Sequence, residues 1–358
     1  VDLSGAEDPI AGAEQWARER CALPIDIEKR TFDTALLRLA EDRYVWYLCQ
    51  HHVVADAAAF AILYEQLEQH YRNVKNAGSA PQPLPGYAAY VAYESSVRES
   101  ASDSQSAANI RGNIVAPALY GSNPPQVSTA NERLTVPFSK SRSSELRDLA
   151  QQPGIRALTP DMALFQLFVT GFAAYLHRVS GQSTITIGAP VHNRSTADFR
   201  RSDGLFMEVY PFTVEIEDTD TFSSLYDKVR AAAATFLRSA KPGQSSTDAN
   251  RRINSVLNYI TANFDPFDGH PVEAEWIHPD HVDAHHHLRL QIHDFTRSGQ
   301  FTLAFDVSTE AFPSKIRAAM PDHFGNVLGA MIDGWEEPIA DFDLMTQSER
   351  SSVLAAVN

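Results

Sequence analysis

The fold of this chain is decided by residues 44–57, which read Tyr-Val-Trp-Tyr-Leu-Cys-Gln-His-His-Val-Val-Ala-Asp-Ala. The first seven residues are almost continuously apolar, which is typical of a β-strand that is covered on both faces. Residues 57–72 then predict a helix, with apolar side chains on one stripe. The polar residues between the strand and the helix therefore lie in a connection whose rigid flanks can present side chains.

Strands and helices alternate along the rest of the chain, which predicts an α/β fold. The patterns predict strands at residues 34–39, 44–50, 132–138, 184–191, 205–216, 255–262, 288–293 and 301–308, and helices at 57–72, 87–93, 141–151, 160–179, 222–237 and 313–334. Residues 120–131 are rich in Ser, Asn and Pro, so they are the best candidate for a linker between two lobes.

The composition argues against several classes of partner. The formal net charge is −15 and basic residues form no run longer than a pair, whereas a nucleic-acid binder needs a basic stripe. We therefore expect neither nucleic acid nor an anionic membrane surface as a partner. No run of about 18 apolar residues predicts a membrane span, and the first residues show no signal-peptide pattern. The two cysteines provide no disulfide framework, so we expect a cytoplasmic protein with reduced thiols.

The adjacent His51 and His52 are the first candidates for chemistry. Consecutive side chains at a strand end point to opposite faces, so we expect at most one imidazole to face a site while the other packs inward. A neutral imidazole accepts a proton from an attacking amine or hydroxyl near neutral pH, or holds that nucleophile in place. Asp56 precedes the predicted helix and is expected to cap its free backbone N–H groups.

Three other kinds of site are not predicted. A histidine-rich tract lacks cysteine ligands and an i, i+4 pair with a carboxylate on a helix, so we interpret it as a solvated loop that leads into a strand, with no metal. Its members are His278, His281, His285, His286, His287 and His293. Neither a G-x-x-x-x-G-K-[ST] phosphate loop nor a G-x-S-x-G nucleophile elbow occurs in the sequence.

Residues 51–57 resemble the HHxxxDG motif of the condensation domains of nonribosomal peptide synthetases. Further segments resemble this family in the same order along the chain. They are residues 23–27 (Leu-Pro-Ile-Asp-Ile), 87–90 (Tyr-Ala-Ala-Tyr), 187–194 (Ile-Gly-Ala-Pro-Val-His-Asn-Arg), 204–211 (Gly-Leu-Phe-Met-Glu-Val-Tyr-Pro) and 342–350 (Phe-Asp-Leu-Met-Thr-Gln-Ser-Glu-Arg). The last segment is similar to the linker that leads into an adenylation domain.

The resemblance implies a two-lobed, V-shaped chloramphenicol-acetyltransferase-like fold with a tunnel between the lobes, which both carrier arms enter. We accordingly expect an N-terminal lobe at residues 1–120, a C-terminal lobe at 121–340 and a linker toward a following domain at 341–358. Members of the family usually carry roughly a hundred residues before the segment with which this chain begins. The first lobe is therefore expected to be incomplete.

The resemblance also implies roles for the site residues. It makes His52 the catalytic residue that faces the tunnel, whereas His51 is structural. Asp56 and Arg194, an arginine of the second lobe, are expected to form a structural ion pair at the active site.

Four further positions matter for the site. Ala57 replaces the motif glycine at the point where the backbone could donate a hydrogen bond to a developing oxyanion. Glu208 occupies the position of the family's asparagine, and Thr213 that of its arginine. Glu208 and Tyr210 are expected to line the tunnel.

The implied function is acyl transfer from a carrier-protein thioester to an amine or a hydroxyl, which yields an amide or an ester. Both substrates would arrive on phosphopantetheine arms, so the expected partners are donor and acceptor carrier proteins and neighbouring synthetase domains, with no directly bound cofactor. Epimerisation is disfavoured because no EGHGR-like segment occurs, and heterocyclisation because its motif has DxxxxD in place of HH. The other alternative is a degenerate domain that docks carrier proteins or recruits tailoring enzymes, which Ala57, Glu208 and Thr213 favour.

Overall fold

The computed structural model describes residues 1–101, 114–122, 124 and 128–357. They form two compact units, and each unit is assembled from separate stretches of the chain. Unit 1 comprises Val1–Tyr87, Arg194–Phe206 and Phe264–His281, and unit 2 comprises Ala88–Asn193, Met207–Asn263 and Val282–Asn358. The sequence patterns predict contiguous lobes, whereas two later segments here pack with the N-terminal residues. Of the linker predicted at 120–131, residues 123 and 125–127 lie outside the described residues.

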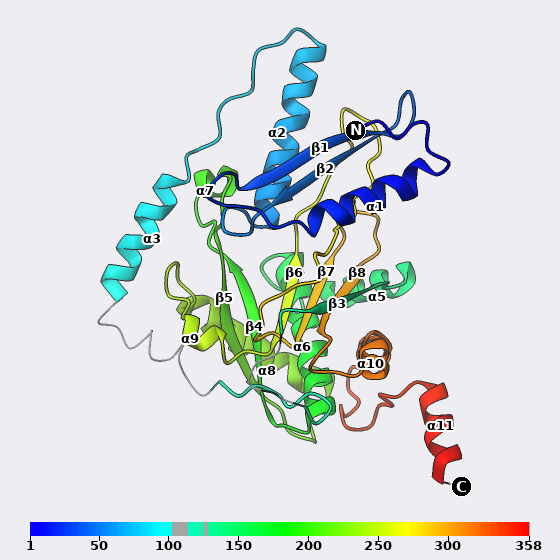
Figure 1. Cartoon of the computed structure of the whole chain (residues 1–358). Coiled ribbons are helices and arrows are strands. Elements are labelled where there is room, and N and C mark those ends of the chain that lie inside the picture. Colours follow the sequence, from blue (N-terminus) through cyan, green and yellow to red (C-terminus); the bar gives the residue numbers. More distant parts are fainter. Residues whose placement is uncertain (102–113, 123, 125–127, 358) are drawn as a thin grey trace. The chain divides into compact units, whose positions relative to one another are not determined.

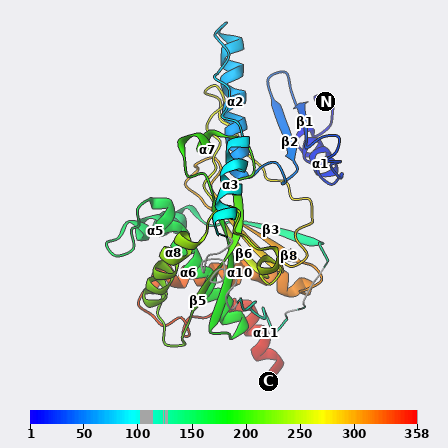
Figure 2. The ribbon, with the colours of Figure 1, turned by 90° about the vertical axis from the view of Figure 1, so that its left-hand side faces the viewer.

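Unit 1 contains a two-stranded antiparallel sheet of β1 (Phe32–Arg38) and β2 (Tyr44–Gln50). Helix α1 (Pro9–Cys21) lies alongside this sheet (Figure 1 and Figure 2). It covers the face that carries Tyr47, whose ring meets Trp16 edge to face at 5.3 Å between centroids. The alternation of strand side chains thus gives the sheet one covered face.

The remaining helices of unit 1 are α2 (Ala57–Lys75) and the short α7 (Ala197–Arg201). The segment 264–281 is attached to α2 through Tyr64, whose hydroxyl donates to the Asp265 carbonyl oxygen at 2.6 Å and whose ring packs on Phe264. These contacts explain why a segment so late in the sequence belongs to the first unit.

Unit 2 is built on a six-stranded mixed sheet in the order β3-β8-β7-β6-β4-β5. The β4–β6 and β6–β7 pairs are parallel and the other pairs are antiparallel. The strands are β3 (Asn131–Pro137), β4 (Thr184–His192), β5 (Met207–Glu215), β6 (Ser255–Ile260), β7 (Leu288–His293) and β8 (Thr302–Ser308). All six strands were predictable from their apolar runs, with ends displaced by at most two residues in either direction.

One layer of helices covers one face of this sheet (Figure 1). Helix α10 (Ser314–Asp333) contacts β3 and β8, α6 (Pro160–Ser180) contacts β6 and β4, and α8 (Phe222–Ser239) contacts β5. The main hydrophobic core lies between these helices and the sheet. Helix α6 is long and apolar enough to cross a membrane, but 78% of its most apolar window is buried inside the protein, as in a core helix.

The other helices of unit 2 are α3 (Ala88–Ala101), α5 (Lys140–Gln151), α9 (Thr247–Asn250) and α11 (Gln347–Val357). The opposite face of the sheet carries a row of polar side chains across four neighbouring strands. Gln291 links Asn258 on one side to Asp306 on the other, at 3.0 and 2.9 Å, and Arg133 pairs with Asp306 at 2.6 Å. Because every member has a hydrogen-bonding partner, this partly buried row is compatible with a stable sheet.

Candidate active site

The two motif histidines lie just beyond the end of β2, and both are exposed. The backbone N–H of His51 donates to the Thr31 carbonyl oxygen at 2.8 Å, and residues 52–54 then form a turn. The Nδ1 atom of His51 accepts a hydrogen bond from the Val53 N–H at 3.1 Å. The prediction that one imidazole packs inward is therefore wrong, because the pair sits in a turn where the alternation of strand side chains no longer applies.

His52 differs from His51 because its imidazole forms no hydrogen bond within the described residues. In the part of the chain that the structure describes, its side chain makes no hydrogen bond or ion pair. Both ring nitrogens are thus available to a substrate, as a general base or a positioning group requires.

Asp56 is almost completely buried, with 2% of its surface exposed. Its Oδ1 accepts from the Ala59 N–H at 2.9 Å, which caps α2, and from Arg194 at 2.9 Å. Its Oδ2 accepts from the Phe206 N–H at 3.0 Å. The predicted capping role is confirmed, and this one carboxylate joins the motif to residues 194–206.

Arg194 completes the buried pair. Besides Asp56, its guanidinium donates to the carbonyl oxygens of Ser202 at 2.6 Å and Gly204 at 3.0 Å. It also stacks over the ring of Phe206, with 4.1 Å to the ring centroid. The expected Asp56–Arg194 ion pair is therefore present. The assignment of Arg194 to the second lobe is wrong, because the segment Arg194–Phe206 packs with the N-terminal residues in unit 1.

Gly204 is a position where the backbone requires glycine. Its φ is +146°, a conformation that residues with a side chain rarely adopt. A Cβ placed there would lie 2.2 Å from the ring of Tyr87, which also meets Phe206 edge to face at 5.2 Å. The glycine thus lets Tyr87 pack directly over the segment that carries the partners of Arg194.

Ala57 is the first residue of α2 and is half-buried. Its φ is not positive: the described non-glycine residues with positive φ are Ala77, Tyr120, Asp268, Asp280 and Arg297. The methyl group that replaces the motif glycine is therefore accommodated without backbone strain. The first N–H groups of a helix have no intrahelical acceptor, so Ala57 keeps a backbone donor at this end of α2.

Glu208 lies on β5 of unit 2 and holds the loop that follows α8. Its Oε1 accepts from the Asn193 amide at 3.1 Å and from the Gly243 N–H at 2.7 Å. Its Oε2 accepts from the Ser245 N–H at 3.1 Å and from the Tyr210 hydroxyl at 3.0 Å. Glu208 thus organises residues 241–245.

Tyr210 is 1% exposed and belongs to the core of unit 2, where burial raises the pKa of its phenol. Thr213 pairs across strands with Thr186, at 3.0 Å between hydroxyls. A tunnel-lining role for Glu208 and Tyr210 stays a prediction.

Comparison with protein-family models matches residues 1–354 to the condensation domain. The chain belongs to the condensation-domain family. A linear gramicidin synthase polypeptide of Brevibacillus parabrevis is 27% identical over 95% of this chain, which corresponds to 5% of that protein. Tyrocidine synthase 2 of the same organism is 23% identical over 90% of this chain and 9% of its own length. This condensation domain therefore spans a small part of its curated relatives.

Solved structures show the same fold. The first condensation domain of the CDA synthetase aligns with a TM-score of 0.76 at 19% identity, over 97% of this chain and 77% of that chain. A variant of the starter condensation domain of rhizomide synthetase, in complex with C8-CoA and Leu-SNAC, aligns with a TM-score of 0.77 at 20% identity, over 96% and 79% of the two chains. The predicted α/β, chloramphenicol-acetyltransferase-like fold is confirmed.

The histidine tract of this condensation domain is more buried than the sequence predicts. His287 is 1% exposed, and burial lowers the pKa of His286 and His293 to about 4. The prediction of a solvated loop is thus wrong for these residues, because the tract runs directly into the buried strand β7. Among the described residues, no group of three His, Cys, Asp or Glu side chains is placed to hold a metal ion.

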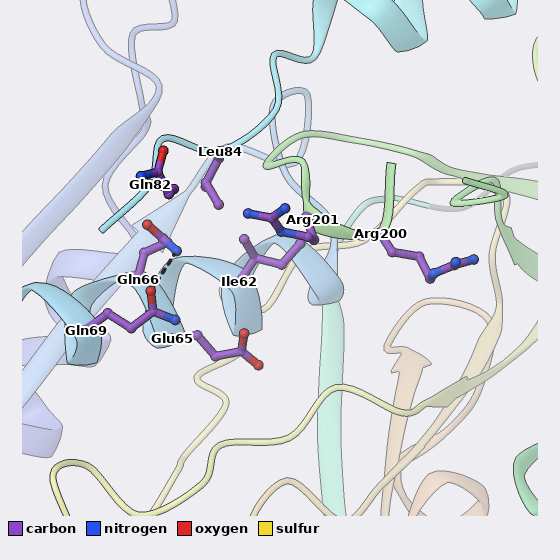
Figure 3. Close-up of a pocket in the computed structure, with 8 residues that line it drawn as sticks. All are labelled: Ile62, Glu65, Gln66, Gln69, Gln82, Leu84, Arg200 and Arg201. Carbon is purple, nitrogen blue, oxygen red and sulfur yellow. Dashed lines mark hydrogen bonds between the residues drawn. The ribbon is translucent and has the colours of Figure 1, made fainter. Parts of the chain in front are cut away.

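A shallow pocket of unit 1 has no signal in the sequence (Figure 3). It has a volume of about 260 Å³ and lies between α2, residues 82–84 and α7. Arg201 points toward Ile62 and Leu84, whereas Arg200 points away from them (Figure 3). Its lining residues come from three separated segments, so only the fold brings them together. They are Ile62, Glu65, Gln66, Gln69, Gln82, Leu84, Arg200 and Arg201.

Proposed function

We propose that this condensation domain transfers an acyl group from a carrier-bound thioester to an amine and so forms an amide bond. The observation that carries the proposal is the contrast within the motif. Asp56 is buried and fully hydrogen-bonded, whereas His52 is exposed and uncommitted on the turn just before it. A rigid support next to a free imidazole suits a catalytic or positioning role.

In the proposed reaction, the amine nitrogen attacks the thioester carbonyl carbon and the C–S bond breaks. The donor arm leaves as a thiol, and His52 accepts or positions the proton of the amine. The backbone N–H of Ala57 is the candidate donor to the carbonyl oxygen as negative charge develops there. Bringing two tethered substrates together would provide much of the rate acceleration.

The proposed substrates are donor and acceptor arms on carrier proteins, which requires no bound cofactor. The rhizomide synthetase structure supports this proposal because its ligands are C8-CoA and Leu-SNAC. An ester product is the variant in which a hydroxyl replaces the amine. The second candidate function is a degenerate docking domain, which the departures at Glu208 and Thr213 favour.

The test is product formation from loaded donor and acceptor carrier proteins, with and without the substitution His52→Ala. We expect the variant to lose about 10²–10⁴-fold in rate, because a positioned proton acceptor typically contributes that much. His70→Ala, an exposed histidine of α2, is the matched control and should keep the wild-type rate.

Two results would contradict the proposal. If the His52→Ala variant keeps most of the wild-type turnover, His52 is not the catalytic residue. A wild-type protein that binds loaded carriers but forms no product would support the docking function instead.

A further inference from the structure

The only two cysteines of the chain are neighbours in space. Cys21 is the last residue of α1 and Cys49 is the sixth residue of β2; both are half-buried and both are free thiols. Cys49 packs against the cluster that includes Ala13, Ala17 and Tyr47, so it lies on the sheet face that α1 covers, and Cys21 lies one turn beyond Ala17 on the same stripe of the helix. The packing of α1 on the sheet thus brings together two thiols that are far apart in the sequence.

An ion pair fixes the backbone on both sides of this contact. Arg20 precedes Cys21 and binds Asp33 with two hydrogen bonds, at 2.5 and 3.1 Å. Asp33 stands directly opposite Cys49 in the antiparallel register of β1 and β2. The last turn of α1, which ends at Cys21, is therefore attached to the sheet at the position of Cys49.

The local chemistry makes the two thiols unequal. The neighbouring Cys21 thiol lowers the pKa of Cys49 to about 6, against the opposing effect of burial, whereas the neighbouring Cys49 and burial both raise the pKa of Cys21. The lowered pKa favours the thiolate form of Cys49, and the thiolate is the reactive form of cysteine. A thiolate beside a second thiol has the arrangement of an attacking and a resolving cysteine.

We propose that Cys21 and Cys49 form an oxidisable dithiol that hydroperoxides convert into an intramolecular disulfide. The Cys49 thiolate attacks the distal peroxide oxygen, the O–O bond breaks, and with one proton the products are a Cys49 sulfenic acid and an alcohol or water. The Cys21 sulfur then attacks the Cys49 sulfur, the S–O bond breaks and water leaves. Two thiols and one hydroperoxide thus give one disulfide, one alcohol or water, and one further water.

The disulfide would link α1 covalently to the strand that leads into the motif. Cys49 is separated from His51 by Gln50 alone, so the crosslink lies next to the motif turn. In the expected cytoplasmic environment such a bond is transient and reports oxidation. This proposal is independent of the acyl-transfer activity and requires only the folded protein.

The experiment treats the full chain with hydrogen peroxide and then blocks the remaining thiols with a maleimide before mass spectrometry. We expect reduced protein to take up two maleimides and oxidised protein none, with a Cys21–Cys49 crosslinked peptide. The crosslink should raise Tm by on the order of 5 °C, because it restricts the unfolded chain. Cys21→Ser should leave Cys49 as a sulfenic acid that dimedone traps, and Cys49→Ser should leave Cys21 slow to react.

Three results would overturn the proposal. They are two maleimides on protein that has been treated with peroxide, a crosslink between two copies of the chain in place of an internal one, or equal alkylation rates of the two thiols in the wild-type protein at pH 7. The alkylation rates need no variant, so the last comparison stands even if a serine variant fails to fold.

Discussion

Asp56 is 2% exposed, and its partner Arg194 is 9% exposed. Solvent stabilises neither charge, so each depends on the hydrogen bonds of the other and of the backbone between residues 199 and 206. His52 lies on the same connection, but its side chain makes no hydrogen bond or ion pair within the described residues. Asp56 and Arg194 thus hold the motif through buried hydrogen bonds, whereas His52, which makes none within the described residues, can act in the chemistry.

Removing the carboxylate of Asp56 should destabilise the protein strongly. We expect Asp56→Ala to lower the free energy of unfolding by about 3–5 kcal/mol, because it leaves the Arg194 charge buried and uncompensated. The measurement is urea unfolding of the wild-type and variant proteins.

A surface ion pair provides the matched control. Asp248 is 87% exposed in its pair with Arg252, so Asp248→Ala should cost at most about 1 kcal/mol. An Asp56→Ala protein that unfolds like the control and yet is inactive would show that Asp56 acts in the chemistry.

Among the secondary-structure elements, α11 is joined to the rest of unit 2 through a chain of hydrogen bonds that begins at Glu349. The Glu349 carboxylate lies 2.9 Å from His323 Nε2 and also accepts from the Thr346 N–H at 2.9 Å. His323 Nδ1 is 2.7 Å from the Tyr120 hydroxyl, which lies 2.9 Å from that of Tyr175. The C-terminal segment is thus joined to the core through buried polar groups.

Glu349→Ala should release α11 from the core. We expect faster proteolytic cleavage beyond residue 340 and a loss of about 1–3 kcal/mol in the free energy of unfolding, because His323 is left buried without its acceptor. Arg350→Ala is the control, since that side chain is 64% exposed in its pair with Asp343. Equal cleavage rates for the two variants would show that Glu349 does not hold the helix.

The sequence predicts some elements of this fold and misses others for identifiable reasons. The core strands are predicted correctly because a short apolar run bounded by turn residues fits few structures other than a buried strand. Helix α1 is missed although Asp8 caps it and Pro9 begins it, because its apolar stripe is weak. Helices α7 and α9 have five and four residues, too few for a helical period to emerge.

The sequence likewise predicts only part of the candidate site. The motif and the Asp56–Arg194 pair are found because each residue lies in a segment with a family pattern. The four hydrogen bonds to Glu208 come from positions 193, 210, 243 and 245, and only the paired and folded chain brings these together. Likewise, nothing in the sequence places Cys21 beside Cys49.

For the whole molecule, partly buried histidines should make stability depend on pH in the acidic range. Burial lowers the pKa of His286 and His293 to about 4, from an ordinary value of 6.5. As the pH falls below 6.5, the unfolded chain binds protons before the folded chain does. The neutral histidines therefore stabilise the fold fully above pH 6.5, and this contribution is lost progressively as the pH falls toward 4.

We expect the free energy of unfolding to fall by on the order of 5 kcal/mol between pH 6.5 and 4, because each of the two histidines contributes about half of this loss. The measurement is urea unfolding at a series of pH values. The double variant His286→Gln/His293→Gln should give a flatter profile over this range, whereas the exposed His70→Gln should follow the wild type. A double variant that loses stability in parallel with the wild type would assign the acid sensitivity to other groups.

Each of the two units is assembled from separate stretches of the chain, and this affects where two related domains can be joined in a chimera. Unit 1 draws on residues up to 87, then on 194–206 and 264–281. A chimera with one crossover at residue 120 would therefore inherit Asp56 from one parent and Arg194, with its backbone acceptors, from the other. If residues 194–206 are exchanged together with the N-terminal stretch, both members of the Asp56–Arg194 pair come from the same parent protein. Tyr87 and Gly204, which pack together, then also come from one parent.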